Sequence, residues 1–325
     1  MSLPHDDQRG GMDSINRMAI ELVDEAIDFA EELRVVPHEL ESGATVLDFG
    51  VDSQAGVEAG MLLAEIQTAG LSTVQTRMDD VAGATTPYVE LQTDHPALSL
   101  LCSQKAGWEL TFDDPAFDGL GSGPARALVA EEDEFHALDY FDEFDLTVLS
   151  VESIDLPGDR IAEHVAETSG VEPSGVFLPT YATGSTVGSV TGAARAAELA
   201  VFRLFELGYD VRNVQSAFGS APLAPVSYDE SVAMARTNDA LAYGGEVHLT
   251  VAEDFGEFDQ VPSSAREEYG TPFEEIFAAA DWDFYDVPET VFAPAKVTID
   301  VVDGPTYVLG ETDEELLAES FGYQT

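Results

Sequence analysis

Apolar positions along the chain follow two different periods, and segments of the two kinds alternate. Helical spacing, with apolar residues every three to four positions, occurs at 14–34, 57–68, 96–107, 158–168 and 228–243. Short apolar runs typical of strands occur at 44–51, 108–112, 146–154, 175–181 and 247–251. Two turns predict hairpins or strand pairs, around Gly83 within 71–92 and at Asp303-Gly304 between 296–302 and 306–309. This mixture favours an α+β fold with mixed α/β sheets over a doubly wound parallel sheet.

Two segments rich in small residues lead into predicted helices. The first, 119–123, is expected to be a turn that opens a helix with Pro124 at its first position. The second, 183–192, is expected to be a turn that opens a helix carrying Arg195 and Glu198 and ending at Gly208. Both lead into the pattern Gly-x-Ala-Arg-Ala, a match too short to establish an internal duplication.

The chain has 325 residues, enough for about two domains. We expect a disordered lead-in at 1–11, an N-terminal α/β domain at 12–150, and a C-terminal α/β domain at 151–325 that carries the Arg-x-x-Glu helix. No apolar stretch reaches the roughly 18 residues of a membrane span, and the first residues lack the apolar core of a signal peptide. The sequence therefore predicts a cytoplasmic protein without membrane partners.

The charge balance is extreme, with 63 acidic against 13 basic residues and a formal net charge of −50. The acids are spread along amphipathic segments, which indicates an acidic surface rather than an acidic tail. Such a surface repels itself unless molar salt shortens the Debye length to about 3 Å. We therefore expect a salt-saturated, halophilic cytoplasm; the alternative is an acidic protein of ordinary cytosol. Nucleic acid is disfavoured as a partner because no basic stripe is present to neutralise phosphates.

Several kinds of chemistry have little support. The only cysteine, Cys102, lies in an apolar run and is expected to be a small core residue. The six histidines show no metal-ligand spacing, so no metal site is predicted. The 119–123 segment has the wrong glycine spacing for a dinucleotide site. Either a tight turn or an anion cradle beside Arg126 remains open for it.

Arg195 and Glu198 stand three residues apart on a helix face that also carries Phe202 and Phe205. Charges on an apolar face are costly to bury unless they are paired or meet a polar ligand. An exposed i,i+3 ion pair is the alternative interpretation. The few retained cations point the same way, because together with Gly/Ser/Thr-rich segments they suggest a pocket for an anionic ligand. They include Lys105, Arg126, Arg195, Arg212 and Arg236.

Four runs, in this order and spacing, are similar to archaeal methenyltetrahydromethanopterin cyclohydrolases: 103–108 (SQKAGW), 121–127 (GSGPARA), 221–226 (APLAPV) and 236–239 (RTND). The resemblance, which also includes the Arg-x-x-Glu helix, extends from about Met12 to the C-terminus. It implies two similar intertwined α/β domains that enclose a pterin pocket, and assembly as a homotrimer. It also implies reversible hydrolysis of 5,10-methenyltetrahydromethanopterin to the 5-formyl form, with no metal and no tightly bound cofactor.

The resemblance places the catalytic Arg and Glu of this family at Arg195 and Glu198. Glu198 is expected to activate water, and Arg195 to hold that carboxylate and keep it ionised. Substrate contacts are expected from Lys105, Gly121, Ser122, Gly123, Arg126, Ser189, Arg236, Asn238 and Asp239. Two alternatives remain: the same chemistry on a tetrahydrofolate, and a pterin-binding protein without catalysis.

Overall fold

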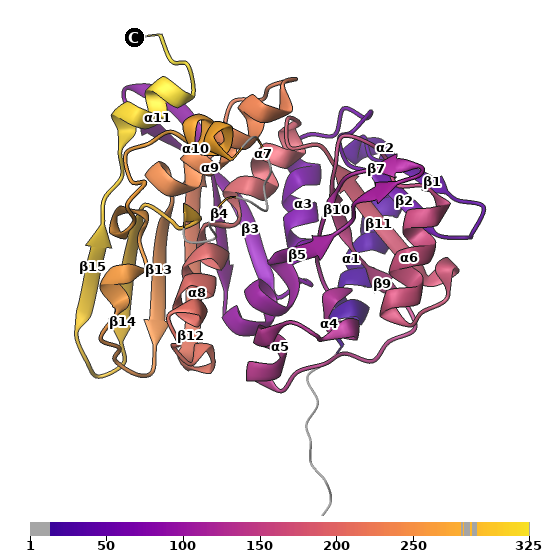
Figure 1. Cartoon of the computed structure of the whole chain (residues 1–325), viewed down its shortest axis with the longest axis horizontal. Helices are drawn as coiled ribbons and strands as arrows, with labels where there is room; N and C mark the ends of the chain where they lie inside the picture. Colours follow the sequence, from indigo (N-terminus) through magenta and orange to yellow (C-terminus); the bar gives the residue numbers. More distant parts are fainter. Residues whose placement is uncertain (1–13, 281, 283–286, 288–290, 325) are drawn as a thin grey trace, which may run out of the picture.

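Two β-sheets lie side by side in the computed structural model, with helices between and around them (Figure 1). The structure describes residues 14–280, 282, 287 and 291–324; the expected lead-in at 1–11 lies outside them. Within these ranges no helix is both long and apolar enough to cross a membrane. The expected mixed α/β class with two sheet-bearing parts is confirmed.

The seven-stranded sheet lies on the right of Figure 1 and mixes parallel and antiparallel pairs. In spatial order it contains β1 (Val36–Glu39), β2 (Thr45–Asp48), β11 (Val176–Tyr181), β10 (Ser150–Glu152), β8 (Leu120–Ser122) and β5 (Ala106–Glu109), with β9 (Thr147–Val148) paired to β11. Helices cover both faces. One core holds α1 (Ile15–Asp28) and α3 (Val57–Gln67) against Leu47 and Phe49, and another holds α6 (Asp159–Ser169) against Val46 and Leu178.

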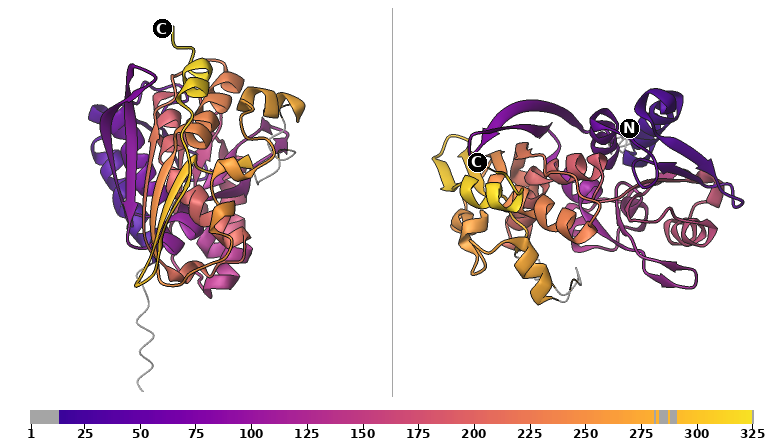
Figure 2. Two further views of the ribbon diagram at one scale, coloured as in Figure 1. Left: turned by 90° about the vertical axis from the view of Figure 1, so that its left-hand side faces the viewer. Right: turned by 90° about the horizontal axis from the view of Figure 1, so that it is seen from above.

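The six-stranded sheet takes strands from both halves of the chain. Its order is β15 (Thr306–Gly310), β14 (Lys296–Val301), β13 (Glu246–Val251), β12 (Val214–Pro222), β4 (Ala84–Thr93) and β3 (Ser72–Val81). The β3–β4 hairpin, with a two-residue turn at Ala82 and Gly83, thus pairs with β12, more than a hundred residues later. Seen from above, this purple hairpin lies against the C-terminal strands (Figure 2). The second predicted hairpin is the β14–β15 pair.

One face of this sheet packs on α8 (Ala196–Glu206), which buries Ala197, Ala200 and Leu204 against Leu91 and Leu249. The remaining helices are α2 (Ala30–Leu33), the π-helix η1 (Ala97–Gln104), α4 (Arg126–Val129), α5 (Asp133–Leu138), α7 (Thr186–Ala193), α9 (Glu230–Gly244), α10 (Phe273–Ala279) and α11 (Glu314–Ser320). Short 3-10 turns are η2 (Pro173–Gly175), η3 (Val211–Asn213), η4 (Phe258–Gln260) and η5 (Ser263–Ala265), and β6 (Phe112–Asp113) pairs with β7 (Ala116–Phe117).

Two local expectations are corrected. The 183–192 segment is not a turn but mostly helix α7, because the Ser185 side chain caps it by accepting from the Gly188 amide. The 119–123 segment holds strand β8, and only Gly123, at φ +116°, needs the freedom of glycine there. The expected boundary between 150 and 151 lies within β10, and the exact domain limits stay a prediction.

Candidate active site

The carboxyl end of η1 gathers the cations of the candidate site. In this helix the Lys105 amide donates to the Leu100 carbonyl, five residues back, so the last carbonyls lack partners within the helix. Two guanidiniums satisfy them: Arg126 Nη1 donates to the carbonyls of Leu101 (3.0 Å) and Lys105 (2.9 Å), and Arg195 Nη1 to that of Gln104 (3.0 Å). The partial negative charge of a helix carboxyl end favours cations there. The two arginines of the repeated Gly-x-Ala-Arg-Ala pattern thus meet at one helix end.

Arg195 occupies the junction between α7 and α8, immediately before the first residue of α8. Its Nη1 lies 3.5 Å from Glu198 Oε2, and its Nη2 lies 3.4 Å from Ser122 Oγ on β8. The Arg195 side chain is 14% exposed and that of Glu198 is 4% exposed. The predicted burial of this pair on an apolar face is therefore present, and the pair links the helix under the six-stranded sheet to a strand of the seven-stranded sheet.

Burial dominates the electrostatics of Glu198. It raises the pKa of Glu198 above its ordinary value, while the nearby positive charges of Arg195, Lys105 and Arg126 work in the opposite direction. The positive charge of Arg195 acts in the expected direction, but burial outweighs it, and the role of Arg195 in keeping this carboxylate ionised stays a prediction. A carboxyl group with a raised pKa accepts and returns a proton more readily at neutral pH.

Lys105 and Arg126 are bound to two carboxylates. Lys105 Nζ lies 3.0 Å from Glu132 and 2.7 Å from Glu134, and Arg126 Nη2 lies 2.6 Å and 3.0 Å from the same two residues. Glu132 is partly buried, but the Arg126 and Lys105 charges outweigh this burial and lower its pKa to about 2. Lys105 also sits 4.9 Å from the centre of the Phe202 ring on α8. This compact network fixes two cations beside Glu198.

A group of polar side chains behind Arg195 escaped the sequence analysis. Tyr181 on β11 donates to Glu152 Oε2 at 3.3 Å, and the Gln67 amide donates to Ser150 Oγ at 3.0 Å and to Tyr181 Oη at 3.4 Å. Burial opposes the charge of Arg195, but Tyr181, Glu198 and Glu152 outweigh it and raise its pKa. The side-chain carbonyl oxygens of Gln67 and Gln104 are buried without a hydrogen-bond partner among the described residues. The available signal in the sequence was a Gln next to an apolar run, at 62–67 and 97–104.

The other predicted substrate contacts have different surroundings. Gly121 packs between Leu149 and Trp108, which leave little room for a Cβ atom, and the buried Ser189 hydroxyl donates to the Ala224 carbonyl. On α9, Arg236 donates to the Ser320 carbonyl and Asn238 to the Met234 carbonyl. Asp239 accepts from the Phe273 amide and the Ser320 hydroxyl, and burial raises its pKa to about 6. These contacts tie α9 to its own preceding turn and to the C-terminal helices.

Arg212 pairs with Asp210 on the surface. Of the residues predicted for the site, the structure brings together Lys105, Ser122, Arg126, Arg195 and Glu198.

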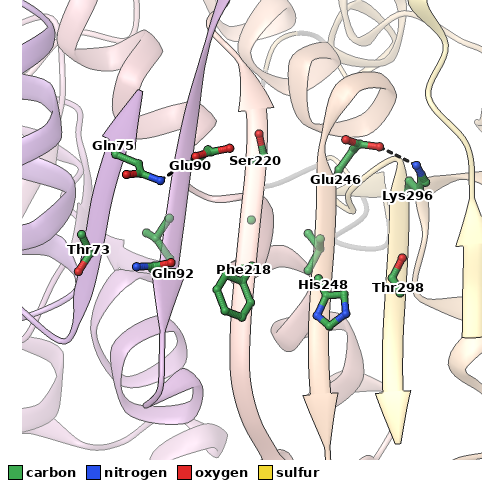
Figure 3. Close-up of a pocket in the computed structure, with 13 residues that line it drawn as sticks. Thr73, Gln75, Glu90, Gln92, Phe218, Ser220, Glu246, His248, Lys296 and Thr298 are labelled. Atoms are coloured by element: carbon green, nitrogen blue, oxygen red, sulfur yellow. Dashed lines mark hydrogen bonds and ion pairs between the residues drawn. The ribbon is translucent and has the colours of Figure 1, made fainter. Parts of the chain in front are cut away.

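Two hollows lie outside this cluster. One, of about 360 Å³, lies on the outer face of the six-stranded sheet, where Phe218 and His248 point outward between Gln92 and Thr298 (Figure 3). The second, of about 420 Å³, lies between α1, α3 and β3. Neither Arg195 nor Glu198 lines them. In the described ranges no group of three or more His, Cys, Asp or Glu side chains has the arrangement of a metal site, and Cys102 is buried in the core.

A buried carboxyl group with a raised pKa beside a guanidinium is typical of enzyme active sites that transfer protons. Comparison with known proteins supplies the family: a sequence model of the Cyclohydrolase (MCH) family matches residues 14–321. The chain therefore belongs to this family of cyclohydrolases, which are hydrolases.

Curated relatives match along nearly their whole length. A methenyltetrahydromethanopterin cyclohydrolase of Halobacterium salinarum is 58% identical over 311 residues, covering 96% of this chain and 99% of that protein. Proteins of the same name from Methanocella arvoryzae and Methanospirillum hungatei are 40% and 38% identical, over 96% of this chain and 99% and 100% of their own lengths. The resemblance inferred from the sequence motifs is confirmed.

Proposed function

We propose that this chain catalyses the reversible hydrolysis of 5,10-methenyltetrahydromethanopterin to 5-formyltetrahydromethanopterin. Membership of the cyclohydrolase family and the names of the full-length relatives support the reaction. The observation that carries the assignment of residues is Glu198, buried with a raised pKa and facing the cations gathered at the end of η1. We assign it the role of general base and then general acid.

The first step is addition of water. The methenyl bridge of the substrate is an amidinium-like cation whose single carbon is electrophilic. Glu198 accepts one proton from a water molecule as the water oxygen bonds to that carbon. Arg195, 3.5 Å away, holds the Glu198 carboxylate in one orientation. The product of this step is a carbinolamine, with the proton on Glu198.

The second step opens the ring. Glu198 returns its proton to N10 as the carbon–N10 bond breaks, and the hydroxyl oxygen forms the carbonyl of the N5-formyl group. The proton of that hydroxyl is released to solvent, so the whole reaction consumes one water and releases one proton. A carboxyl group whose pKa lies above the ordinary value suits both directions of this transfer.

Substrate contacts divide into two groups in this proposal. Ser122, which touches Arg195, is placed to contact substrate, whereas Lys105 and Arg126 contribute their charge from within the network with Glu132 and Glu134. Contacts from Gly121, Gly123, Ser189, Arg236, Asn238 and Asp239 stay predictions, as does the pterin pocket between the two sheet-bearing parts.

The replacement of Glu198 by Gln tests the proposal. Gln keeps the shape of the side chain but cannot take a proton, so kcat should fall about 10²- to 10⁴-fold while substrate binding stays measurable. Decay of the methenyl absorbance in molar KCl follows turnover directly. Turnover of E198Q close to that of the parent protein would remove Glu198 from the mechanism.

A matched control lies on the same helix. Arg203 and Glu206 repeat the i,i+3 spacing of the catalytic pair, with 3.2 Å between Nη1 and Oε2 and a Glu206 side chain that is 22% exposed. E206Q should therefore keep its turnover. Assaying the parent protein and both variants with the methenyl forms of tetrahydromethanopterin and of tetrahydrofolate shows which of the two is the substrate. A methenyl absorbance band that shifts but persists with the parent protein would indicate binding without catalysis.

We also propose that the enzyme works at high salt. The net charge of −50 and the relatives from Halobacterium salinarum support this adaptation. A homotrimer, a cytoplasmic location and independence from a tightly bound cofactor stay predictions of the sequence and its resemblance.

A further inference from the structure

Gln104 contacts both the guanidinium of Arg195 and the main chain immediately before Arg195. Its main-chain carbonyl accepts from Arg195 Nη1 at 3.0 Å, and its side-chain Nε2 donates to the Ala194 carbonyl at 3.3 Å. Gln104 is the last residue of η1, and Ala194 is the residue that caps α7. One residue therefore fixes the guanidinium and the backbone from which that side chain starts.

The burial of the Gln104 side chain indicates that its amide has a role beyond packing. The side chain is fully buried, and its Oε1 has no hydrogen-bond partner among the residues that the structure describes. A buried amide normally satisfies both of its ends, since an unpaired polar atom costs about 1–3 kcal/mol. Leu or Met would fill the same volume without that cost. Gln at this position is therefore poorly explained by packing alone.

We propose that Gln104 is a positioning residue of the cyclohydrolase reaction, which sets the guanidinium of Arg195 against the Glu198 carboxylate. It acts through Arg195 and is not itself placed on the substrate. This inference rests on the proposed roles of Arg195 and Glu198. Misplacement of a catalytic group by about 1 Å can cost 100-fold in rate.

The inference also has a consequence for proton transfer. Titratable and charged groups that face Glu198 are Arg195, Lys105 and Arg126, and those that face Arg195 are Glu198, Tyr181 and Glu152. Arg195 is the first of the cations that oppose the rise in the Glu198 pKa. If its guanidinium drifts away, the Glu198 pKa rises further. Because kcat falls where the base is protonated, the acidic limb of the kcat–pH profile then moves to higher pH.

Two substitutions test the inference. Q104L removes the donor to Ala194. Q104E keeps the side-chain volume but replaces that donor with an acceptor, and it adds a negative charge to the residue whose main-chain carbonyl Arg195 contacts. Both should lower kcat about 10- to 100-fold and change KM less than about threefold. The acidic limb should lie highest for Q104E, then Q104L, then the parent protein.

Ser99→Ala is the matched control, since Ser99 is also buried on η1 and its hydroxyl bonds Ser72 at 2.6 Å, away from Arg195. S99A should lower the melting temperature without moving the acidic limb. If both Gln104 variants behave like S99A, Gln104 is structural and the inference is wrong. If Q104L does not fold, Q104E decides alone. Failure of the proposed function has a different signature, which is no turnover by the parent protein or full turnover by E198Q.

Discussion

Arg126 and Arg195 follow the same short sequence pattern and donate to the same helix end, yet their surroundings differ sharply. Arg126 is only 1% exposed and engages Glu132 and Glu134 as well as several main-chain carbonyls. Arg195 is more exposed, at 14%, and within the described part of the chain its one carboxylate contact is the 3.5 Å approach to Glu198. The N–H donors of Arg126 all have hydrogen-bond acceptors in the protein, whereas those of Arg195 make fewer and longer hydrogen bonds.

We propose that this difference separates a structural charge from a functional one. A buried ion pair with complete hydrogen bonding holds a fold in one arrangement. A buried carboxyl group with one distant partner keeps the capacity to exchange a proton or to meet another charge, and Glu198 has that character. The two arginines share the same short sequence pattern, so substitutions at each of them and at Glu132, a partner of Arg126, test the distinction.

The largest effect is expected at Arg126. Arg126→Met leaves Glu134 buried with Lys105 as its remaining cationic partner, and breaking such a network costs about 3–5 kcal/mol of unfolding free energy. Denaturant unfolding in molar KCl measures it. Arg195→Met, the matched variant, should cost much less stability; equal losses would show that the two sites are not different in kind.

The next effect is on rate. Arg195→Ala should lower kcat about 100-fold, which corresponds to about 2.7 kcal/mol in the barrier. It should also move the acidic limb of the profile to higher pH, because Glu198 loses the first of its opposing cations. Arg195→Lys should restore part of the limb, since it returns the charge without the planar fork. A profile unchanged in Arg195→Ala would contradict the electrostatic role.

The smallest effect concerns acid stability. The folded-state pKa of Glu132 is lowered to about 2 from an ordinary 4.5, so its ion pairs contribute stability above pH 4.5 that is lost as pH falls toward 2. Glu132→Gln should lower the free energy of unfolding by about 1–2 kcal/mol at neutral pH, a value reduced for the partial exposure of Glu132. It should also reduce the change of that free energy with pH between pH 4.5 and pH 2. Thermal unfolding across that range measures both. An unchanged slope in the variant would place the acid sensitivity elsewhere.

Much of the fold was predictable because periodicity reports local burial. The helix at 57–68, the hairpin at Asp303 and the strand at 175–181 follow from apolar spacing and turn residues. The 183–192 segment was not predictable as a helix, since its glycines and serines are poor helix formers that tertiary packing between α3 and α9 supports.

The candidate site was predictable only in part. Arg195 and Glu198 lie three residues apart, so a helix model brings them together without knowledge of the fold. Gln104, Tyr181 and Glu152 come from η1, β11 and β10, and only the three-dimensional arrangement of these elements unites them. The ion pairs of Arg126 with Glu132 and Glu134 likewise depend on the path of the chain between α4 and α5, which the sequence pattern does not predict.

The pairing of β4 with β12 has a consequence for biosynthesis. When only the first two hundred residues have been synthesised, the edge of β4 that later pairs with residues 217–222 of β12 has no neighbouring strand. An exposed edge of this kind invites pairing with other nascent chains, and closing such a distant contact slows maturation. Chaperone capture of the growing polypeptide should therefore peak before β12 emerges.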